Sequence, residues 1–520
     1  MKVVYIGAGS FRFTYDLLKN FAMLSCIMPF ELWLVDIDAQ LLRTVTRILH
    51  KIADKANIRD SLVIHSSVDR RKALAGADTV IISISVGQQS SEWFDIHIPN
   101  KFGIPHTTGD TCGPGGIMRA MRTIPEIIAI VKDIENLCPD AMILNYTNPM
   151  SFITLAANQA CPRVTTTGIC HELLAGMPVL FNLIKKTGIR DIPCWESLDI
   201  EYSGINHFAW LFSVKHKGKD LYPVIKENTE LGISTSKRPA SFMLLKEFGY
   251  FPYPGSRHVL EFMPEYFNYF NAEAVWRAYN RPVIRNIPPL IQYEGIPRLR
   301  DVKLLENQRK LVILVFKAIA NGMLPAPSPT FEGERVVEMI ADRITSLAGV
   351  HDKNLQRFHP VNVINTGRYI VSNLPENCVV ETSGFFENGK IETRHNAQLP
   401  EEILSLVKPF AENQQRVVDA GLSGDSDKLL EAFINDPVCA FIEDNHTVKD
   451  MMLNMLHYQM KWLPQFKGSI PSSSGIGRLA QHIDSSELKD SMARQVKYPP
   501  KASLSSKAVF PNRKSDLKKS

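Results

Sequence analysis

The chain opens with Met1-Lys2-Val3-Val4-Tyr5-Ile6-Gly7-Ala8-Gly9-Ser10, an apolar run that leads directly into a glycine-rich turn. A segment with helical periodicity follows near residues 11–24, and a second apolar run at 31–35 ends at Asp36. Short apolar runs rich in β-branched residues, separated by helices, are typical of buried parallel strands. The order of strand, glycine turn, helix, strand and acidic residue predicts a nucleotide-binding α/β unit.

The same alternation continues toward the middle of the chain. Further strands are expected at residues 62–65, 79–84, 142–145 and 164–168. Helices are expected between them, at residues 39–56, 117–136 and 149–160. Because parallel strands need crossover connections, we expect an α/β fold with a Rossmann-like, doubly wound parallel sheet over residues 1–170.

The order of the expected elements changes after residue 170. A helix precedes two strands, and long helices follow, at residues 171–187, 198–203, 210–215, 333–349, 400–421, 427–435 and 446–462. We interpret residues 171–465 as an α+β domain for substrate and metal binding and for oligomerisation. Residues 466–520 are rich in Ser, Lys and Pro, which predicts a basic, disordered tail.

Composition restricts the class of protein. Of the 520 residues, 45% are hydrophobic and 22% are charged, as in ordinary globular proteins. No apolar stretch approaches the roughly 18 residues of a membrane helix, and the first residues do not resemble a signal peptide, so we expect a cytoplasmic protein. The eight cysteines are scattered, which indicates reduced thiols. Residues 485–520 carry a net charge of +6 and residues 1–484 sum to −1, so nothing in the nearly neutral body argues for nucleic-acid binding.

The N-terminal turn predicts a dinucleotide site. Gly7 would make the tight turn, Gly9 would let the backbone approach a pyrophosphate, and Ser10 lies where the helix begins. Asp36 stands where a carboxylate accepts hydrogen bonds from the adenosine ribose, and it would repel a 2′-phosphate, so NAD is favoured over NADP. Arg12 replaces the third small residue of the full fingerprint, and a purely structural glycine turn is the alternative.

A segment without pattern and three short strings follow the later strands. Residues 93–116 show little helical or strand pattern, which predicts a long functional loop after the fourth strand. The strings are Asn145-Tyr146-Thr147-Asn148-Pro149-Met150, Gly168-Ile169-Cys170-His171-Glu172 and Gly204-Ile205-Asn206-His207-Phe208. Strand ends of a parallel sheet meet at one edge, so a thiolate and an imidazole there would bind a divalent cation. An ordinary core cysteine is the alternative.

These motifs together resemble glycoside hydrolase family 4. The resemblance covers about residues 1–465 and is carried by residues 7–10, 109–117, 148–150, 170–172, 204–207, 257–258 and 261–262. Members are NAD- and Mn²⁺-dependent glycosidases with a fold similar to that of lactate and malate dehydrogenases, and they are commonly dimers or tetramers. The chain resembles the α-glucosidase and α-galacturonidase branch, because His follows Cys170 where 6-phosphoglycosidases carry Asp or Asn.

The resemblance implies the binding residues. Cys170 and His207 would be the ligands of Mn²⁺, which would act as a Lewis acid on the sugar oxygens. Asn148 and Asn206 would contact sugar hydroxyls. Arg257 is a candidate for substrate binding, because a guanidinium matches a C6 carboxylate in a bidentate manner; a nicotinamide pyrophosphate or a core acid is the alternative partner.

The resemblance also implies the catalytic residues. His171 would protonate the leaving group, and Asp110 would orient and charge it, although a loop cap is the alternative for Asp110. At the position directly before Arg257, the sequence departs from the family pattern for the base that removes the C2 proton. Ser256 stands there, and serine is a poor base unaided. Tyr253 is the candidate base if the metal or Arg257 lowers its phenol pKa. The further candidates are Tyr250 and Glu261.

The implied reaction is hydrolysis of an O-glycosyl bond by C3 oxidation, C2 deprotonation, elimination of the aglycone and addition of water, without net redox change. Unphosphorylated α-galacturonides are favoured as substrates, and α-glucosides and α-galactosides stay open. A 2-hydroxyacid dehydrogenase and a non-catalytic NAD- or sugar-binding regulator are alternatives from other classes. The expected partners are a small glycoside and further copies of the chain, in a homo-dimer or homo-tetramer, with no nucleic acid and no membrane.

Overall fold

The structure is a computed structural model that describes residues 1–9, 29–56, 58–189, 191–236, 238–269, 332–347, 358–365, 370–393 and 397–468. Ser10, the helix expected near residues 11–24 and nearly all of the expected tail lie outside the described residues.

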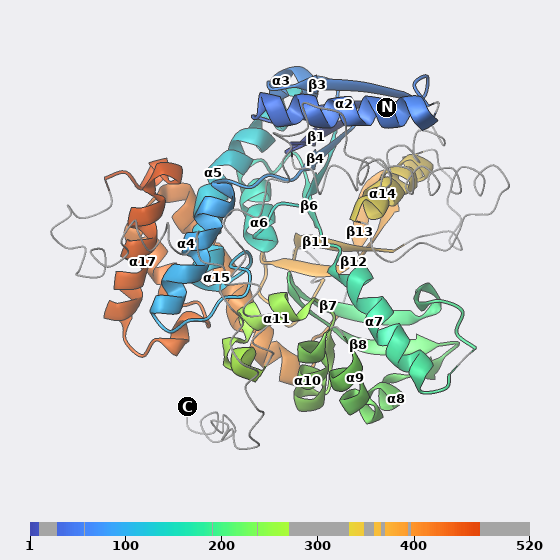
Figure 1. Cartoon of the computed structure of the whole chain (residues 1–520), viewed down its shortest axis with the longest axis vertical. Helices are drawn as coiled ribbons and strands as arrows, with labels where there is room; N and C mark the ends of the chain where they lie inside the picture. Colours follow the sequence, from blue (N-terminus) through green and yellow to red (C-terminus); the bar gives the residue numbers. More distant parts are fainter. Residues whose placement is uncertain are drawn as a thin grey trace, which may run out of the picture. The chain divides into compact units, whose positions relative to one another are not determined.

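Six parallel strands form the first part of the sheet, as the sequence predicts (Figure 1). β1 (Lys2–Ile6) lies between β2 (Phe30–Val35) and β4 (Thr79–Ile82). The remaining parallel strands are β3 (Leu62–Ser67), which pairs with β2, and β5 (Met142–Asn145) and β6 (Thr166–Ile169), which extend the sheet beyond β4. The order β3-β2-β1-β4-β5-β6 is the doubly wound order of dinucleotide-binding folds, so the predicted Rossmann-like sheet is confirmed.

Side chains of β1 alternate between two hydrophobic cores. Val4 and Ile6 pack in one cluster, and Val3 and Tyr5 pack in another, and all four are at most 5% exposed. A strand that is buried on both faces has no polar side, which explains why the sequence reads as a continuous apolar run.

The second half of the chain continues the same sheet. β11 (His359–Ile364) pairs antiparallel with β6, and the next strands along the sheet are β12 (Val379–Glu387), β7 (Asp199–Ile205), β8 (Phe208–His216) and β10 (Phe251–Pro252). Two short strands lie off this path, β13 (Lys390–Thr393) on β12 and β9 (Lys219–Asp220) on β8. The α+β character of residues 171–465 therefore takes the form of antiparallel strands added to the parallel sheet, and the boundary at residue 170 stays a prediction.

Helices flank this sheet, and several match their expected ranges closely. Those before residue 270 are α2 (Ala39–Ala56), α3 (Arg70–Leu74), α4 (Gln88–Lys101), α5 (Gly113–Leu137), α6 (Met150–Ala160), α7 (Glu172–Lys186), α8 (Tyr222–Glu227), α9 (Thr229–Thr235), α10 (Pro239–Phe248) and α11 (Ser256–Phe262). The later ones are α14 (Glu332–Leu347), α15 (Glu401–Ser423), α16 (Ser426–Ile434) and α17 (Asn445–Gln459). Figure 1 shows α4, α5, α15 and α17 grouped on one side of the sheet, where α15 packs on α5 and α6.

The loop expected at residues 93–116 is a wrong prediction. Helix α4 occupies Gln88–Lys101, and α5 already begins at Gly113, which leaves 102–112 as the connection. The physical reason is packing, because α4 contacts both α5 and α17 and therefore shows no clear apolar stripe against a polar face.

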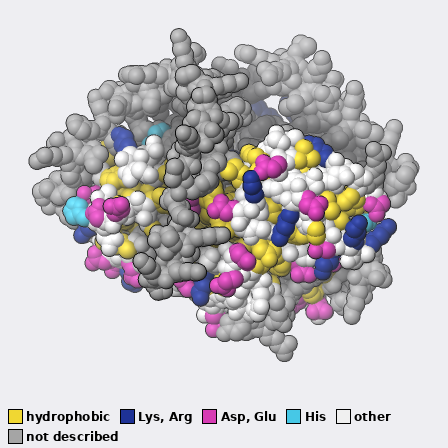
Figure 2. Space-filling model, turned by 90° about the horizontal axis from the view of Figure 1, so that it is seen from below, with side chains coloured by type: hydrophobic (Ala, Val, Ile, Leu, Met, Phe, Trp, Pro, Cys, Tyr) yellow, Lys and Arg dark blue, Asp and Glu magenta, His cyan; other side chains and the backbone are white. Residues whose placement is uncertain are grey.

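The described surface mixes charges of both signs. Figure 2 shows Lys and Arg side chains interspersed with Asp and Glu on one face, as expected for a nearly neutral body. Among the described helices, none combines the length and the apolar character that crossing a bilayer requires.

Candidate active site

The N-terminal glycine turn is built for close approach of the backbone. Gly7 has a φ of +96°, and a Cβ atom on it would overlap the carbonyl oxygen of Ser83 after β4, so only glycine fits. The amide of Gly9 donates to Asp36 Oδ2 over 2.7 Å, and Asp36 Oδ1 accepts from the amide of Asp38 over 2.8 Å. Asp36 therefore fixes the turn from the end of β2, beside the crevice that binds dinucleotides in such sheets.

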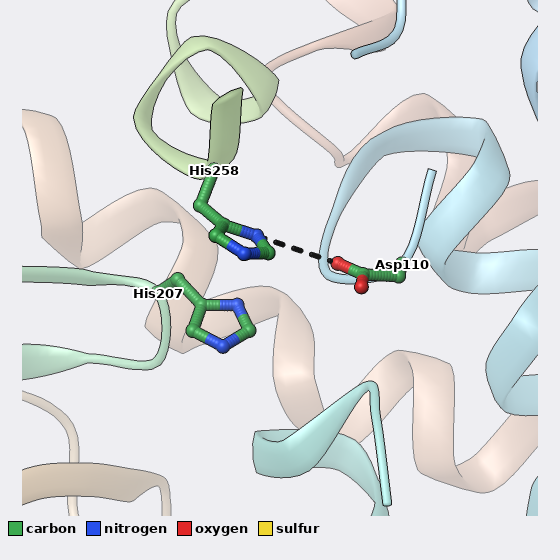
Figure 3. Close-up of side chains that lie close together, drawn as sticks. All are labelled: Asp110, His207 and His258. Carbon is green, nitrogen blue, oxygen red and sulfur yellow. Dashed lines mark ion pairs between the residues drawn. The ribbon is translucent and has the colours of Figure 1, made fainter. Parts of the chain in front are cut away.

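A cluster of three polar side chains lies at the carboxyl edge of the sheet (Figure 3). Asp110 comes from the loop before α5, His207 from the turn between β7 and β8, and His258 from α11. Their ligand atoms all lie within 4.8 Å of one another. His258 Nδ1 is 3.6 Å from Asp110 Oδ1, and the two histidines are 3% exposed.

Hydrogen bonds assign the proton on His207. Thr111 Oγ1 donates to Asp110 Oδ1 over 2.8 Å and lies 2.9 Å from His207 Nδ1. Since the hydroxyl proton is used on Asp110, Thr111 accepts from Nδ1–H, which leaves the lone pair on Nε2 of His207. Metal-binding histidines commonly donate their other ring N–H in this way.

The electrostatics of the cluster favour the forms of His207 and Asp110 that can bind a metal, a neutral imidazole and an ionised carboxylate. Burial lowers the pKa of His207 to about 3, and repulsion by His258 acts in the same direction, so the imidazole is neutral at physiological pH. Burial raises the pKa of Asp110, but the hydrogen bond and charge of His258 outweigh it and hold the pKa well below its usual value. A neutral imidazole beside a carboxylate is a donor set that fits a divalent cation.

The predicted ligand Cys170 is not a member of this cluster. It follows β6, is 2% exposed and interacts with the side chain of Asn206. Burial and the carboxylates of Glu381 and Glu172 raise the pKa of its thiol well above the usual value. The structure therefore adds two potential ligands to His207, namely Asp110 and His258, and a bound cation would be needed to favour the Cys170 thiolate.

The expected role of Asp110 in orienting and charging His171 stays a prediction. Asp110 faces His258, whereas His171 Nε2 lies 3.6 Å from Oε1 of its neighbour Glu172. His171 caps the N-terminal end of α7 beside Glu172, and the loop of Asp110 faces His258 of α11.

Glu172 is a residue whose role the sequence analysis missed. Its Oε1 is 3.7 Å from His258 Nε2, and its Oε2 lies 3.0 Å from Arg238 and accepts from the amide of Gly255 over 2.7 Å. Burial raises its pKa, but Arg238 and the histidines lower it below the usual value, so Glu172 is ionised. The only sequence signal was its place in the string Cys170-His171-Glu172.

Two asparagine side chains offer free acceptors to a ligand. Asn148 Nδ2 donates to Asp110 Oδ2 over 3.4 Å, and Asn206 Nδ2 donates to Glu381 Oε2 over 2.8 Å. In each residue the amide oxygen is buried and has no partner among the described residues. Each amide is thus anchored through its nitrogen by a carboxylate and leaves one oxygen to accept from a hydroxyl.

Tyr253 does not have the electrostatic setting expected of a base. Its hydroxyl donates to Glu381 Oε1 over 2.5 Å. Burial and the Glu381 carboxylate raise its pKa well above the usual value, which is the opposite of the lowered pKa that the expected base role requires. The second candidate, Glu261, is fully buried with a pKa raised by burial to about 8, and it accepts from the amide of Asp110 over 3.2 Å.

Arg257 is placed differently from its neighbours in α11. Its side chain is exposed, whereas His258 is buried, and its carbonyl oxygen accepts from Thr107. No described acidic residue pairs with its guanidinium, so the interpretation of Arg257 as a partner of a core acid is not supported.

The fold and the site define an α/β protein with a Rossmann-like sheet and a histidine–carboxylate cluster at the carboxyl edge of that sheet. The family model described as "Family 4 glycosyl hydrolase" matches residues 2–185, and that of the "Family 4 glycosyl hydrolase C-terminal domain" matches residues 202–439. The chain belongs to family 4 of the glycosyl hydrolases and is a glycosidase of that family, which confirms the resemblance seen in the sequence.

Relatives agree with this assignment, and a solved structure agrees with the fold. The chain is 31% identical over 472 residues to an alpha-galactosidase of Bacillus subtilis (strain 168), covering 90% of this chain and 100% of the relative. It is 29% identical over 484 residues to an alpha-galacturonidase of Thermoanaerobacter italicus, covering 89% and 98%. A 6-phospho-alpha-glucosidase from gut microorganisms, solved in complex with NAD and Mn²⁺, superposes with a TM-score of 0.67 at 22% identity over 89% of this chain and 99% of that one.

Proposed function

We propose that this protein hydrolyses unphosphorylated α-glycosides, with α-galacturonides as its substrates, in an NAD- and Mn²⁺-dependent reaction. The observation that carries the proposal is the cluster of Asp110, His207 and His258, whose ligand atoms lie within 4.8 Å of one another. Beside it, Asn148 and Asn206 each have a buried amide oxygen that a sugar hydroxyl would satisfy. The similarity to alpha-galactosidases and alpha-galacturonidases supports the choice of sugar.

The residues present fit both cofactors. The turn of Gly7 and Gly9 with Asp36 would hold NAD, and His207 with Cys170, assisted by Asp110 and His258, would hold Mn²⁺. When bound, NAD supplies a reversible hydride acceptor for C3 and the cation supplies positive charge for the sugar oxygens. A thiol ligand requires reducing conditions, which accords with our proposal that the protein acts in the cytoplasm. We also propose that it is a homo-dimer or homo-tetramer.

The chain's own residues would orient the sugar and move protons. Asn148 and Asn206 would accept hydrogen bonds from sugar hydroxyls, and their anchors on Asp110 and Glu381 would keep them in place. The side chain of His171 is 33% exposed, and its Nε2 lies 3.6 Å from Oε1 of Glu172. It would donate a proton to the oxygen of the leaving group.

Arg257 would select the uronide. Its exposed guanidinium has no acidic partner among the described residues and would bind the C6 carboxylate through two parallel hydrogen bonds. An α-galactosidase is the alternative, favoured by the 31% identity to the enzyme of Bacillus subtilis. An α-glucosidase has weaker support, since the similarity to the enzyme of Erwinia rhapontici covers only 43% of this chain.

The test is cleavage of 4-nitrophenyl α-glycosides, including the α-galacturonide, in D₂O with NAD⁺, Mn²⁺ and a reductant. We expect cleavage of the galacturonide that requires both cofactors and places deuterium at C2 of the released sugar. Cleavage without NAD⁺, or a product free of deuterium, would reject the mechanism. Net reduction of NAD⁺ would favour a 2-hydroxyacid dehydrogenase, and binding of NAD⁺ without any cleavage would favour a regulator.

A further inference from the structure

We infer that Glu381 is a positioning residue that orients Asn206 and Tyr253 beneath the sugar and metal site. Glu381 lies in β12 and is 1% exposed. Nothing in the sequence motifs points to it. The inference rests on the proposed function, because Asn206, which it positions, is assigned to sugar binding and directly precedes the proposed metal ligand His207.

Three neutral donors from different elements converge on the Glu381 carboxylate. Tyr253, which follows β10, donates its hydroxyl to Oε1 over 2.5 Å. Asn206, from the turn after β7, donates Nδ2 to Oε2 over 2.8 Å, and Asn362 of β11 donates Nδ2 to the same oxygen over 3.2 Å. Both carboxylate oxygens are therefore used, and each donor is held in one orientation.

The main chain of Glu381 is also fixed beneath the site. Glu381 pairs with Gly204 where β12 meets β7, and this strand pairing holds its main chain; the hydrogen bond that its carbonyl oxygen accepts from Ser203 Oγ over 2.9 Å does not involve the carboxylate. This pairing lies two residues before Asn206, which in turn precedes His207 of the donor cluster. Because Asn206 is anchored through Nδ2, its oxygen is left free for a ligand and the turn that carries His207 is held.

Within the described part of the chain, Glu381 is held by hydrogen-bond donors and has no cationic partner. Among the described residues, no Lys, Arg or His forms an ion pair with it, and burial raises the pKa of its carboxyl, with the acid Glu172 acting in the same direction. A buried carboxylate with only neutral donors stabilises a fold less well than a neutral side chain of the same shape. Orientation of site groups therefore explains Glu381 better than stability does.

The test compares Glu381→Gln with Ser203→Ala. Glutamine keeps the shape but replaces one acceptor oxygen by a donor, so it cannot accept from all three groups. Alanine at 203 removes only the hydrogen bond to the Glu381 carbonyl. Three quantities are measured for each: the affinity of the NAD-free protein for Mn²⁺ alone, by electron paramagnetic resonance titration, kcat and KM for cleavage, and the midpoint of thermal unfolding.

We expect Glu381→Gln to weaken Mn²⁺ binding and lower kcat, each by about 10- to 100-fold as for other residues that orient metal ligands. Its unfolding midpoint should equal or exceed that of the wild type, and Ser203→Ala should behave as the wild type in both functional readouts. The inference is wrong if Glu381→Gln binds Mn²⁺ and cleaves normally, or if its losses are matched by a lower unfolding midpoint. Failure of the proposed function is seen separately, in a wild type that cleaves without NAD⁺ or Mn²⁺.

Discussion

The imidazole rings of His207 and His258 lie one above the other, with centroids 4.1 Å apart and planes tilted by 31°. One ring comes from the turn between β7 and β8 and the other from α11, so the contact joins two parts of the chain about fifty residues apart. Asp110 completes the group from the opposite side of the site (Figure 3). Two stacked histidines can both face one ligand only if at least one is neutral, as the low pKa of His207 ensures.

His258 should therefore contribute to metal affinity. We expect His258→Gln to weaken binding of Mn²⁺ by about 10- to 100-fold, either as a lost ligand or as a lost partner of Asp110. The measurement is titration of the NAD-free protein with Mn²⁺. His216→Gln is the matched control, because His216 is also buried but lies in β8 with Ser197 as its partner. Equal affinities of the two variants would contradict the assignment of His258 to the site.

Arg257 should discriminate between sugars. We expect Arg257→Ala to raise KM for an α-galacturonide by about 10- to 100-fold, since a charge-assisted hydrogen bond contributes about 1.5–3 kcal/mol. Cleavage of the matching α-galactoside should change little, and Arg257→Lys should restore only part of the loss because lysine cannot bind in a bidentate manner. The check is steady-state kinetics on both sugars. A similar loss on both would show that Arg257 does not recognise the carboxylate.

The buried ion pair of Arg122 and Asp95 should stabilise the helices beside the site. The two side chains are 1% and 0% exposed with an N–O distance of 2.6 Å, and Gln459 at the end of α17 also donates to Asp95. Arg122→Met would leave Asp95 buried without its cation, which should lower the free energy of unfolding by about 3–5 kcal/mol. Urea unfolding measures this.

An exposed ion pair provides the control for Arg122. Arg59 and Asp54 also form an ion pair, but their side chains are 64% and 43% exposed. Arg59→Met should change the free energy of unfolding by no more than about 1 kcal/mol, because solvent screens such pairs. Losses of equal size in Arg122→Met and Arg59→Met would refute the role of burial.

Asp436 should make stability depend on pH. It is 1% exposed, and burial raises its pKa to about 7, above the usual value of 3.8. Between these values the folded protein keeps a proton that the unfolded chain releases, so rising pH lowers the free energy of unfolding by up to about 1.4 kcal/mol per pH unit. Asp436→Asn does not titrate. As the pH rises through this range, the wild type should therefore lose stability relative to the variant. Thermal unfolding at several pH values measures this. A difference in stability between the two proteins that does not change with pH would refute the raised pKa of Asp436.

The parallel half of the fold could be predicted because its signals are local. The segments that form β1, β2 and α2 each carry an apolar pattern in their own sequence, and the bounds expected from it are close to those observed. β11 and β12 could not be predicted in this way, since β11 finds its partner in β6, nearly two hundred residues earlier. The mixed polarity of α4 has the same cause, because its environment is supplied by α5 and by distant α17.

The site shows the same division. The motifs identified Asp110, Asn148 and His207, because these residues lie in strings typical of the family. Glu381 was missed because its only signal is a charged residue inside the apolar run that begins at Val379, and its function depends on donors that the fold brings from three other strands or turns. The proximity of Asp110 to His258 also depends on where α11 packs, which no local pattern encodes.

Asp36 and Asp38 lie two residues apart, but only Asp36 should select the cofactor. Asp36 anchors the amide of Gly9 at the end of β2, whereas Asp38 is exposed and accepts from the amides that begin α2. Asp36→Asn should weaken NAD binding by about 10-fold and reduce the preference for NAD over NADP. The reason is that the variant lacks the negative charge that holds the ribose hydroxyls and repels a 2′-phosphate. Asp38→Asn removes the same charge two residues away and should leave that preference unchanged. Dissociation constants for both nucleotides, measured by calorimetry, decide the matter: if the two variants shift the NAD/NADP ratio alike, overall charge near the turn and not the Asp36 carboxylate selects the cofactor.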